Sequence, residues 1–329
     1  MEEKILSFDV TLTGAMIGVV DETGNLIFGE KVQADYVNLD RPQIIASLKE
    51  NALRLLEKYN LTLDEITRVA ADVSGFIDHS MGIVKWIPLL SNFTEWNLKA
   101  DLAKAFPGKE TFVLNDGFAA ALGEFWAGSG VQYDSILFYT LDSTVNGAII
   151  SHGKLTIGSR GFAGAFGHGL NIGHSNVPCV CGLKGCLSTI CSEQGIFKFI
   201  MDEFKNNPSH PAAFYFNNVD LEKLDSGVIY DIYKKNNEPN EIYDLVKSAL
   251  WPVLKHMAIM FMAIDPDAII FSGSIARMDD LLIHLIKDAL KELTFERFTE
   301  NSIVEQAILG PTAAMIGAGY FALNDGMVD

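Results

Sequence analysis

Three of the four cysteines in this chain lie within eight positions, as Cys179, Cys181 and Cys186 of the segment CVCGLKGCL. Gly182 and Gly185 interrupt the segment, and glycine lets the backbone turn tightly enough for three sulfurs to converge. Cysteines that are clustered in a large chain are typical of a metal site, whereas a disulfide framework disperses them. The alternative, a chance cluster of buried thiols, is disfavoured by the glycine-punctuated spacing.

Tetrahedral zinc needs a fourth ligand, and two histidines lie within a loop's reach upstream of the cysteines. His168 belongs to the segment GAFGHG, and His174 lies closer to the cysteines and competes for the role. Four protein ligands leave no open position for water, so we expect a structural zinc that fixes a loop. Cys191 lies on the apolar segment that follows, and we interpret it as a small core residue.

A carboxylate suited to proton transfer, Asp116, stands where the expected strand TFVLND ends and an expected helix begins. At such a junction the side chain can point into a cleft and take a proton from a hydroxyl group. The same position suits a helix N-cap, and the residue types alone favour that structural role. One residue can serve both purposes.

Length and charge limit the classes of function. The 329 residues predict two domains of ordinary size. The 25 Lys and Arg residues against 42 Asp and Glu residues give a net charge of −17. A charge of that sign disfavours binding to nucleic acid or to an anionic membrane surface.

The N-terminal segment MEEKILSFDV carries acidic residues where a signal peptide carries basic ones. The most apolar segment, HMAIMFMAI, is too short to span a bilayer. We therefore expect a soluble, cytoplasmic protein that makes no membrane contact.

Two segments share one plan, which predicts two related α/β halves. Residues 4–27 and 135–157 each read as a hairpin of two apolar strands followed by the start of a third strand. A cleft between two such domains is where a small ligand would bind.

Helical patterns separate the expected strands. Residues 40–60 have apolar side chains at helical spacing, with Asp40 as the N-cap and Pro42 just inside the start. Further helices are expected at 117–128, at 241–264 with a bend near Pro252, and in the small-residue segment 310–326.

These features together resemble the ROK family of bacterial sugar kinases and sugar-responsive repressors. The segments that carry the resemblance are VLNDGFAAALGE, LSNFTEW, GFAGAFGHGLNIGHSNVPCVCGLKGCL, IDPDAIIFSGSIA and LGPTAAMIGAGYFAL. The resemblance implies a two-domain, ribonuclease-H-like actin/hexokinase fold of the α/β class, with sugar in the cleft. We place the small domain at 1–117 plus about 309–329, and the larger domain with the zinc loop at 118–308.

The resemblance also implies roles for individual residues. Asp116 matches the catalytic general base, and Asn92 and Asn115 match sugar contacts. His168, with the three cysteines, matches the zinc ligands and also touches the sugar. The positions that match the ATP site are Asp9, Thr13, Ser143, Gly147 and Gly273.

The sequence departs from the family pattern in the phosphate loops. The first pattern, D-x-G-G-T, reads Asp9-Val10-Thr11-Leu12-Thr13, so both glycines that let backbone N–H groups approach phosphate are gone. In the second loop Asp142 would set a carboxylate near phosphate, which is repulsive. The third turn reads Ser272-Gly273-Ser274 in place of three glycines, and this turn can tolerate serine.

The sugar side departs as well, because Ala165 and Ser188 replace two glutamates that accept hydrogen bonds from sugar hydroxyls in the family. Each lost partner costs about 1–3 kcal/mol, and two losses weaken a sugar site by a factor of roughly 100.

Three hypotheses follow. The first is a catalytically impaired binder or regulator of a sugar or related small molecule. We expect this chain to be without the N-terminal helix-turn-helix domain of family repressors, and therefore expect no direct binding to nucleic acid. The second is an active kinase for a hexose or N-acetyl amino sugar that uses Mg-ATP and Asp116 as the base. The third is a structural subunit of another ROK protein. Family members are commonly homodimers or homotetramers, and we expect one of these states.

Overall fold

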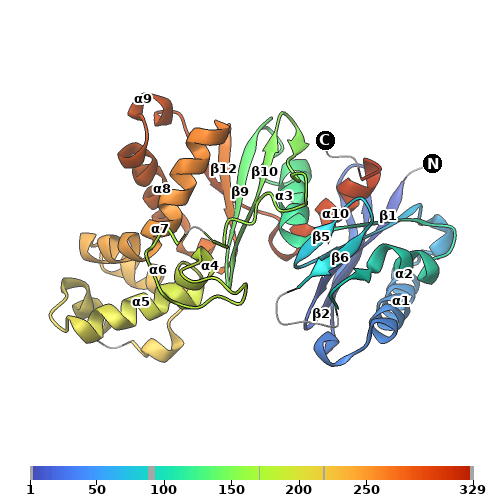
Figure 1. Cartoon of the computed structure of the whole chain (residues 1–329), viewed down its shortest axis with the longest axis horizontal. Coiled ribbons are helices and arrows are strands. Elements are labelled where there is room, and N and C mark those ends of the chain that lie inside the picture. Colours follow the sequence, from blue (N-terminus) through green and yellow to red (C-terminus); the bar gives the residue numbers. More distant parts are fainter. Residues whose placement is uncertain (1–2, 88–92, 170, 218, 327–329) are drawn as a thin grey trace. The chain divides into compact units, whose positions relative to one another are not determined.

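The computed structural model describes residues 3–87, 93–169, 171–217 and 219–326. The chain is α/β and divides into two compact units (Figure 1). Unit 1 comprises residues 1–133, 148–164 and 308–329, and unit 2 comprises residues 134–147 and 165–307.

The sheet of unit 1 has the strand order β3-β2-β1-β4-β8. Its first three strands are antiparallel, as the shared plan of the sequence predicts, and β1, β4 and β8 are parallel. The bounds are β1 (Lys4–Thr11), β2 (Gly14–Asp21), β3 (Leu26–Gln33), β4 (Arg68–Val73) and β8 (Glu110–Asn115). A small antiparallel sheet adds β5 (Phe76–Asp78), β6 (Ile83–Trp86) and β7 (Trp96–Asn97).

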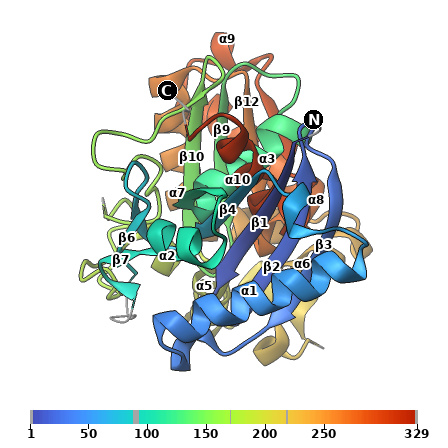
Figure 2. The same cartoon turned by 90° about the vertical axis from the view of Figure 1, so that its right-hand side faces the viewer.

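Helices cover both faces of the unit 1 sheet, and α1 crosses one of them (Figure 2). Leu6, Phe8 and Val10 of β1 join the core cluster that contains the apolar face of α1. Ser7 points the other way, because side chains alternate along a strand, and its hydroxyl donates to the carbonyl of Met315 in α10 at 2.6 Å. The bounds are α1 (Arg41–Lys58), α2 (Leu98–Ala105), α3 (Asp116–Ala127) and α10 (Ala313–Leu323).

The start of α1 confirms the expected cap. The Asp40 carboxylate accepts from the backbone N–H of Gln43 at 2.8 Å, and the Gln43 side chain accepts from the Asp40 N–H at 3.0 Å. Pro42 occupies the first turn, where its missing N–H costs nothing.

The helices α3 and α10 pack closely enough to exclude side chains at their contact. A Cβ on Gly123 would lie 2.0 Å from the Ala313 carbonyl oxygen, and one on Gly317 would lie 1.8 Å from the Ala119 carbonyl oxygen. This packing joins α3 to unit 1, so the observed division falls after Tyr133 and differs from the boundary expected after residue 117.

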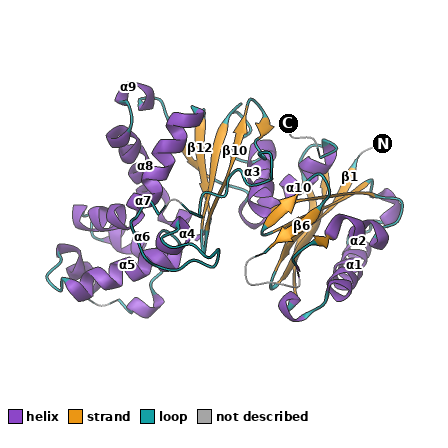
Figure 3. Ribbon diagram, viewed as in Figure 1, coloured by secondary structure: helices purple, strands orange, loops and turns teal. Residues whose placement is uncertain are grey.

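The second sheet has the order β11-β10-β9-β12-β13, with β9, β12 and β13 parallel. Most of unit 2 outside the sheet is helical (Figure 3). The bounds are β9 (Ile136–Leu141), β10 (Val145–Ser151), β11 (Lys154–Leu155), β12 (Ala268–Ser272), β13 (Ile303–Gln306), α4 (Leu187–Ile190), α5 (Glu193–Asn206), α6 (Ser226–Lys235), α7 (Asn240–Ile264), α8 (Asp279–Leu293) and α9 (Glu296–Thr299). Short 3-10 helices lie at Tyr36–Asn38, Leu63–Glu65, Pro211–Phe216, Leu221–Lys223, Ser274–Met278 and Gly310–Thr312.

The long helix α7 runs for 25 residues and carries Pro252 inside it, as expected. By length and composition alone it could cross a membrane, which the shorter segment considered in the sequence could not. Of its most apolar window, 56% is buried within the structure. Burial of that extent is what the core helix of a globular unit shows, and such a helix passes the same test of length and hydropathy.

Candidate functional site

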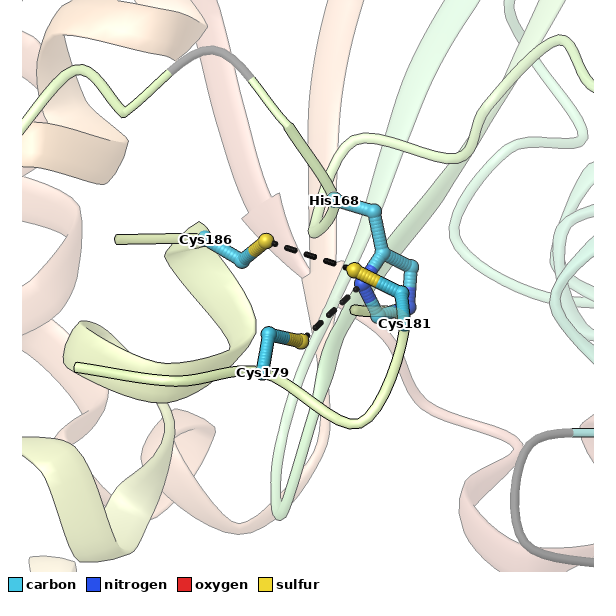
Figure 4. Close-up of side chains that lie close together, drawn as sticks. All are labelled: His168, Cys179, Cys181 and Cys186. Carbon is cyan, nitrogen blue, oxygen red and sulfur yellow. Dashed lines mark hydrogen bonds between the residues drawn. The ribbon is translucent and has the colours of Figure 1, made fainter. Parts of the chain in front are cut away.

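One compact group of metal-ligand side chains stands out among the described residues, and it lies in unit 2 (Figure 4). The ligand atoms of His168, Cys179, Cys181 and Cys186 all lie within 4.8 Å of one another. The Cys179 sulfur is 3.5 Å from His168 Nδ1, and the sulfurs of Cys181 and Cys186 are 3.6 Å apart. Three sulfurs and one imidazole are the ligands of a closed, tetrahedral zinc site, so the residues present fit the metal that the sequence predicts.

A tight hairpin holds the cysteines in this position. The Cys179 N–H donates to the Leu183 carbonyl at 2.8 Å, and an isolated antiparallel bridge pairs Pro178 with Lys184. Gly185 has a φ of 68°, and a Cβ there would lie 1.9 Å from the Asn171 side-chain oxygen. Only glycine fits this position, so the glycine at 185 is part of the hairpin that presents the sulfurs.

The surroundings of the cluster favour a neutral imidazole. Burial lowers the pKa of His168, and the neutral ring is the form that binds metal. Burial raises the pKa of Cys186 to about 12 in the absence of metal, so zinc binding there would displace a proton. His174 is exposed and does not join the group, and the buried Cys191 sulfur instead faces the Ala249 carbonyl at 3.7 Å.

The residue after the cysteine loop, Ser188, is engaged within unit 2. Its hydroxyl accepts from the Val145 N–H at 3.1 Å and lies 3.2 Å from the Val145 carbonyl, to which it donates. The Ser188 N–H donates to the Gly167 carbonyl at 2.9 Å. The serine that replaces a family glutamate therefore ties α4 to β10 and to the segment before His168.

The proposed base, Asp116, is the first residue of α3 in unit 1. Its Oδ2 accepts from the Ser74 hydroxyl at 2.6 Å, and its Oδ1 accepts from the Gly117 N–H at 2.9 Å. The N-cap is Asn115, whose side-chain oxygen accepts from the N–H groups of Gly117 and Phe118 and whose Nδ2 donates to the Gly75 carbonyl. The N-cap interpretation of Asp116 is therefore wrong, because the preceding residue performs that role.

Sequence reasoning missed Asp72, which lies beside Asp9 and close to Asp116. The parallel register of β1 and β4 sets Asp72 directly opposite Asp9. Burial, followed by the charges of Asp9 and Asp116, raises the Asp72 pKa well above its usual value. Burial, followed by the charge of Asp116, raises the Asp9 pKa to about 6. The one signal in the sequence was a lone carboxylate among the apolar residues of the segment VAADV.

The expected phosphate loop of unit 1 is a tight hairpin turn. Leu12 and Thr13 form the exposed turn between β1 and β2, and the Thr11 hydroxyl donates to the Gly14 carbonyl at 3.0 Å. Asp9 lies behind this turn on β1. The expected sugar contact Asn92 lies outside the described residues.

The expected phosphate positions of unit 2 come together at the ends of β9 and β12. Asp142 Oδ1 accepts from the Ser143 N–H at 2.8 Å and from the Ser274 hydroxyl at 3.1 Å. A Cβ on Gly273 would lie 2.3 Å from the Leu141 carbonyl oxygen, so this turn packs directly on the end of β9.

Gly147 lies under an aromatic ring, because a Cβ there would be 2.2 Å from the Phe166 side chain. This glycine is therefore required for packing within unit 2, whether or not a phosphate binds nearby.

Sequence comparison finds relatives over nearly the whole chain. A sequence profile of the ROK family matches residues 5–325. The glucokinase of Thermotoga maritima is 28% identical over 320 residues, which cover 96% of this chain and 96% of that protein.

Solved structures of the family have the same fold. A ROK family glucokinase from Streptomyces griseus, in complex with glucose and AMPPNP, matches with a TM-score of 0.76 at 22% identity, over 98% of this chain and 100% of that chain. A ROK family transcriptional regulator, a homologue of the Escherichia coli MLC protein, matches with a TM-score of 0.82 at 22% identity, over 99% of this chain and 79% of that chain. The predicted two-domain actin/hexokinase fold is confirmed.

Proposed function

The chain belongs to the ROK family, and we propose that it binds a sugar or a related small molecule while its transfer of phosphate from Mg-ATP is impaired. The observation that carries this proposal is a contrast between two sets of residues. The carboxylate suited to a sugar hydroxyl, Asp116, is present and oriented by Ser74. The glycines that would admit phosphate are replaced in the first loop, and a carboxylate stands in the second.

The sugar-binding half of the proposal rests on unused hydrogen-bonding capacity. A carboxylate has about four lone-pair sites, and protein donors occupy two of those on Asp116. The Asn115 amide has a second N–H besides the one that reaches the Gly75 carbonyl. An acceptor and a donor at adjacent positions suit one sugar hydroxyl, which both donates and accepts.

The impairment half rests on the donors that Asp142 uses. A phosphate-binding turn offers backbone N–H and hydroxyl groups to an anion. Here the Asp142 carboxylate accepts from two such groups, the Ser143 N–H and the Ser274 hydroxyl. A nucleotide would have to displace this carboxylate or tolerate its charge, and either event weakens binding.

An active sugar kinase is the second candidate, and one specific observation favours it. Asp116 keeps both a hydroxyl partner and the position at a helix start from which a base can act. The whole-length relative from Thermotoga maritima is named a glucokinase. In this alternative Asp116 accepts the hydroxyl proton as the sugar oxygen attacks the terminal phosphate.

The proposal also includes a zinc ion, an assembly and a compartment. His168 and the three clustered cysteines would hold zinc, which would supply no catalytic step and would fix the 178–187 loop. We further propose a homodimer or homotetramer in a cytoplasm that keeps the thiols reduced. Metal analysis of the purified chain tests the zinc ion, and light scattering tests the assembly.

Isothermal titration calorimetry tests the sugar site. The zinc-loaded chain is titrated with hexoses, hexosamines and N-acetylated amino sugars, and Asp116→Asn serves as the matched variant. We expect one sugar class to bind with an affinity that falls at least severalfold in the variant. Equal affinity in both proteins, or no binding by any sugar, would contradict the proposal.

A further inference from the structure

Asp72 is a fully buried carboxyl group with no hydrogen-bond donor. It lies in β4, its side chain has a relative exposure of 0%, and neither of its oxygens has a hydrogen-bond partner among the described residues. An ionised carboxylate is not stable in such a place, because burial removes the water that solvates its charge. Some other species, either a proton or a cation, must neutralise it.

The strand alternation shows which face of the sheet Asp72 occupies. Val69, Ala71 and Val73 of β4 belong to the core cluster that contains α1, so Asp72 points to the opposite face. Asp9 lies on this face too, because Phe8 and Val10 belong to the α1 cluster. The helix α10 packs against β1 and β4 on this face.

Few charged groups face Asp72 from the elements that pack around it. Asp9 comes from β1, Asp116 from the start of α3, and the charge of Lys31 on β3 acts on Asp9. The one titratable side chain of α10 is Tyr320, which packs against Trp126. No cation among these groups pairs with Asp72 in the described part of the chain.

The contact between Asp72 and Asp9 defines the neutralising species. The two carboxyl groups are directly opposite in the β1–β4 register and lie within hydrogen-bonding reach of each other. Two ionised carboxylates have no proton to share and would repel. The same contact becomes a hydrogen bond when one of them is protonated, and the more buried partner is the one that keeps the proton.

We propose that Asp72 is a positioning residue that, in its neutral form, donates a hydrogen bond to Asp9 and so fixes the Asp9 carboxylate beside Asp116. The role goes beyond the proposed function, because it concerns a residue outside the family's phosphate and sugar motifs. It also links the site to pH. Loss of the Asp72 proton would leave three carboxylates in one corner with no donor between them, and their repulsion would move Asp9 and Asp116 apart.

The sign of the pH effect on stability follows from the direction of the Asp72 pKa. In the unfolded chain the group ionises near 3.8, and in the folded chain it keeps its proton to a much higher pH. Between these values the folded chain binds more protons than the unfolded chain, so this group's contribution to stability falls as pH rises. Asparagine at this position has the same shape, cannot ionise and can still donate to Asp9.

Thermal unfolding of the full chain and its variants, compared at the same pH between pH 4 and pH 8.5, tests the proposal. We expect the Tm of Asp72→Asn to equal that of the unmodified chain near pH 4 and to exceed it by a growing margin toward pH 8.5. Asp64→Asn is the matched control, because Asp64 is an exposed aspartate of the same unit. For the control we expect a Tm difference that does not change with pH. The same result for Asp72→Asn would overturn the proposal.

Two further experiments distinguish a proton on Asp72 from a cation bound between Asp72 and Asp9. Magnesium chloride without nucleotide is added to the unmodified chain and to Asp72→Asn. A rise in Tm confined to the unmodified chain would show that Asp72 and Asp9 bind a cation, and would overturn the proposal that a proton neutralises Asp72.

Infrared spectroscopy of the unmodified chain at pH 7 does not depend on how a variant folds. A protonated-carboxyl band supports the proposal, and its absence overturns it. Neither experiment uses sugar or ATP, so both results can be interpreted even if the proposed function is wrong.

Discussion

The cysteine cluster of unit 2 and the aspartate corner of unit 1 each bring several ligand-type side chains together, and they differ in what surrounds them. The cluster gathers His168 and three cysteines within 4.8 Å on a hairpin shaped for them. The corner gathers Asp9, Asp72 and Asp116 with no donor for the buried member. The first arrangement has the composition of a closed metal site, whereas the second is a set of like charges that protons must hold together.

A second buried carboxyl group, Glu124, sharpens the contrast within unit 1. It is also 0% exposed, but its oxygens accept from the backbone N–H groups of Ser129, Ile308 and Leu309 at 2.7–3.2 Å. Burial alone therefore does not leave a carboxyl group without partners. The supply of backbone donors separates Glu124 from Asp72.

The largest effect is expected in the cysteine cluster. Cys181→Ser should reduce bound zinc from about one per chain to none and lower the Tm more than any other change considered, because metal binding is coupled to folding. Cys191→Ala is the control, since Cys191 is buried outside the cluster. Inductively coupled plasma mass spectrometry and thermal unfolding measure both results. Full zinc content in Cys181→Ser would show that the cluster is not the metal site.

Next comes Asp116. Under the alternative of an active kinase, Asp116→Asn should lower sugar-dependent ADP release by roughly 10²–10⁴-fold, because an amide cannot take the hydroxyl proton. The variant should still fold, because the Gly117 N–H can donate to the amide oxygen of the new asparagine. A coupled ADP assay and circular dichroism report the two outcomes. Turnover that survives the substitution would mean that another residue is the base.

Glu124 should respond in the opposite direction to Asp72. Glu124→Gln leaves one acceptor oxygen where two oxygens accept from three backbone N–H groups, so at least one buried N–H loses its partner. We expect a loss of about 1–3 kcal/mol in the free energy of unfolding at pH 7. Asp72→Asn at the same pH should gain stability. Urea unfolding compares the two variants. A stabilised Glu124→Gln would remove the distinction between carboxylates with and without donors.

The smallest change is expected at Asp142, which is exposed. Asp142→Ala frees the Ser143 N–H and the Ser274 hydroxyl and removes a negative charge. We expect severalfold tighter binding of Mg-AMPPNP by calorimetry, consistent with the modest worth of exposed charges. Weaker nucleotide binding in this variant would show that Asp142 assists the nucleotide.

The same comparison explains which parts could be predicted from the sequence. The cysteines and His168 lie within one short segment, so local spacing was enough to find the site and its ligands. The helix starting at Asp40 was equally local, because its cap and Pro42 adjoin the apolar pattern. The two repeated hairpins could also be predicted, because each is formed by neighbouring segments of the chain.

The aspartate corner could not be predicted because strand pairing creates it. Asp9 and Asp72 are 63 residues apart, and only the parallel register of β1 and β4 makes them neighbours. The end of unit 1 was also non-local, since α3 joins that unit through its contact with the C-terminal α10. Asn115 and Asp116 are both residue types that suit an N-cap, so the sequence could not show which of the two caps α3.

ADP release from Mg-ATP by the folded, zinc-loaded chain, measured with a panel of hexoses, hexosamines and N-acetylated amino sugars, decides between impaired transfer and an active kinase. We expect that no sugar raises the rate above that of Asp116→Asn, although at least one sugar binds. Sugar-dependent ADP release that disappears in Asp116→Asn would contradict impaired transfer and establish an active sugar kinase.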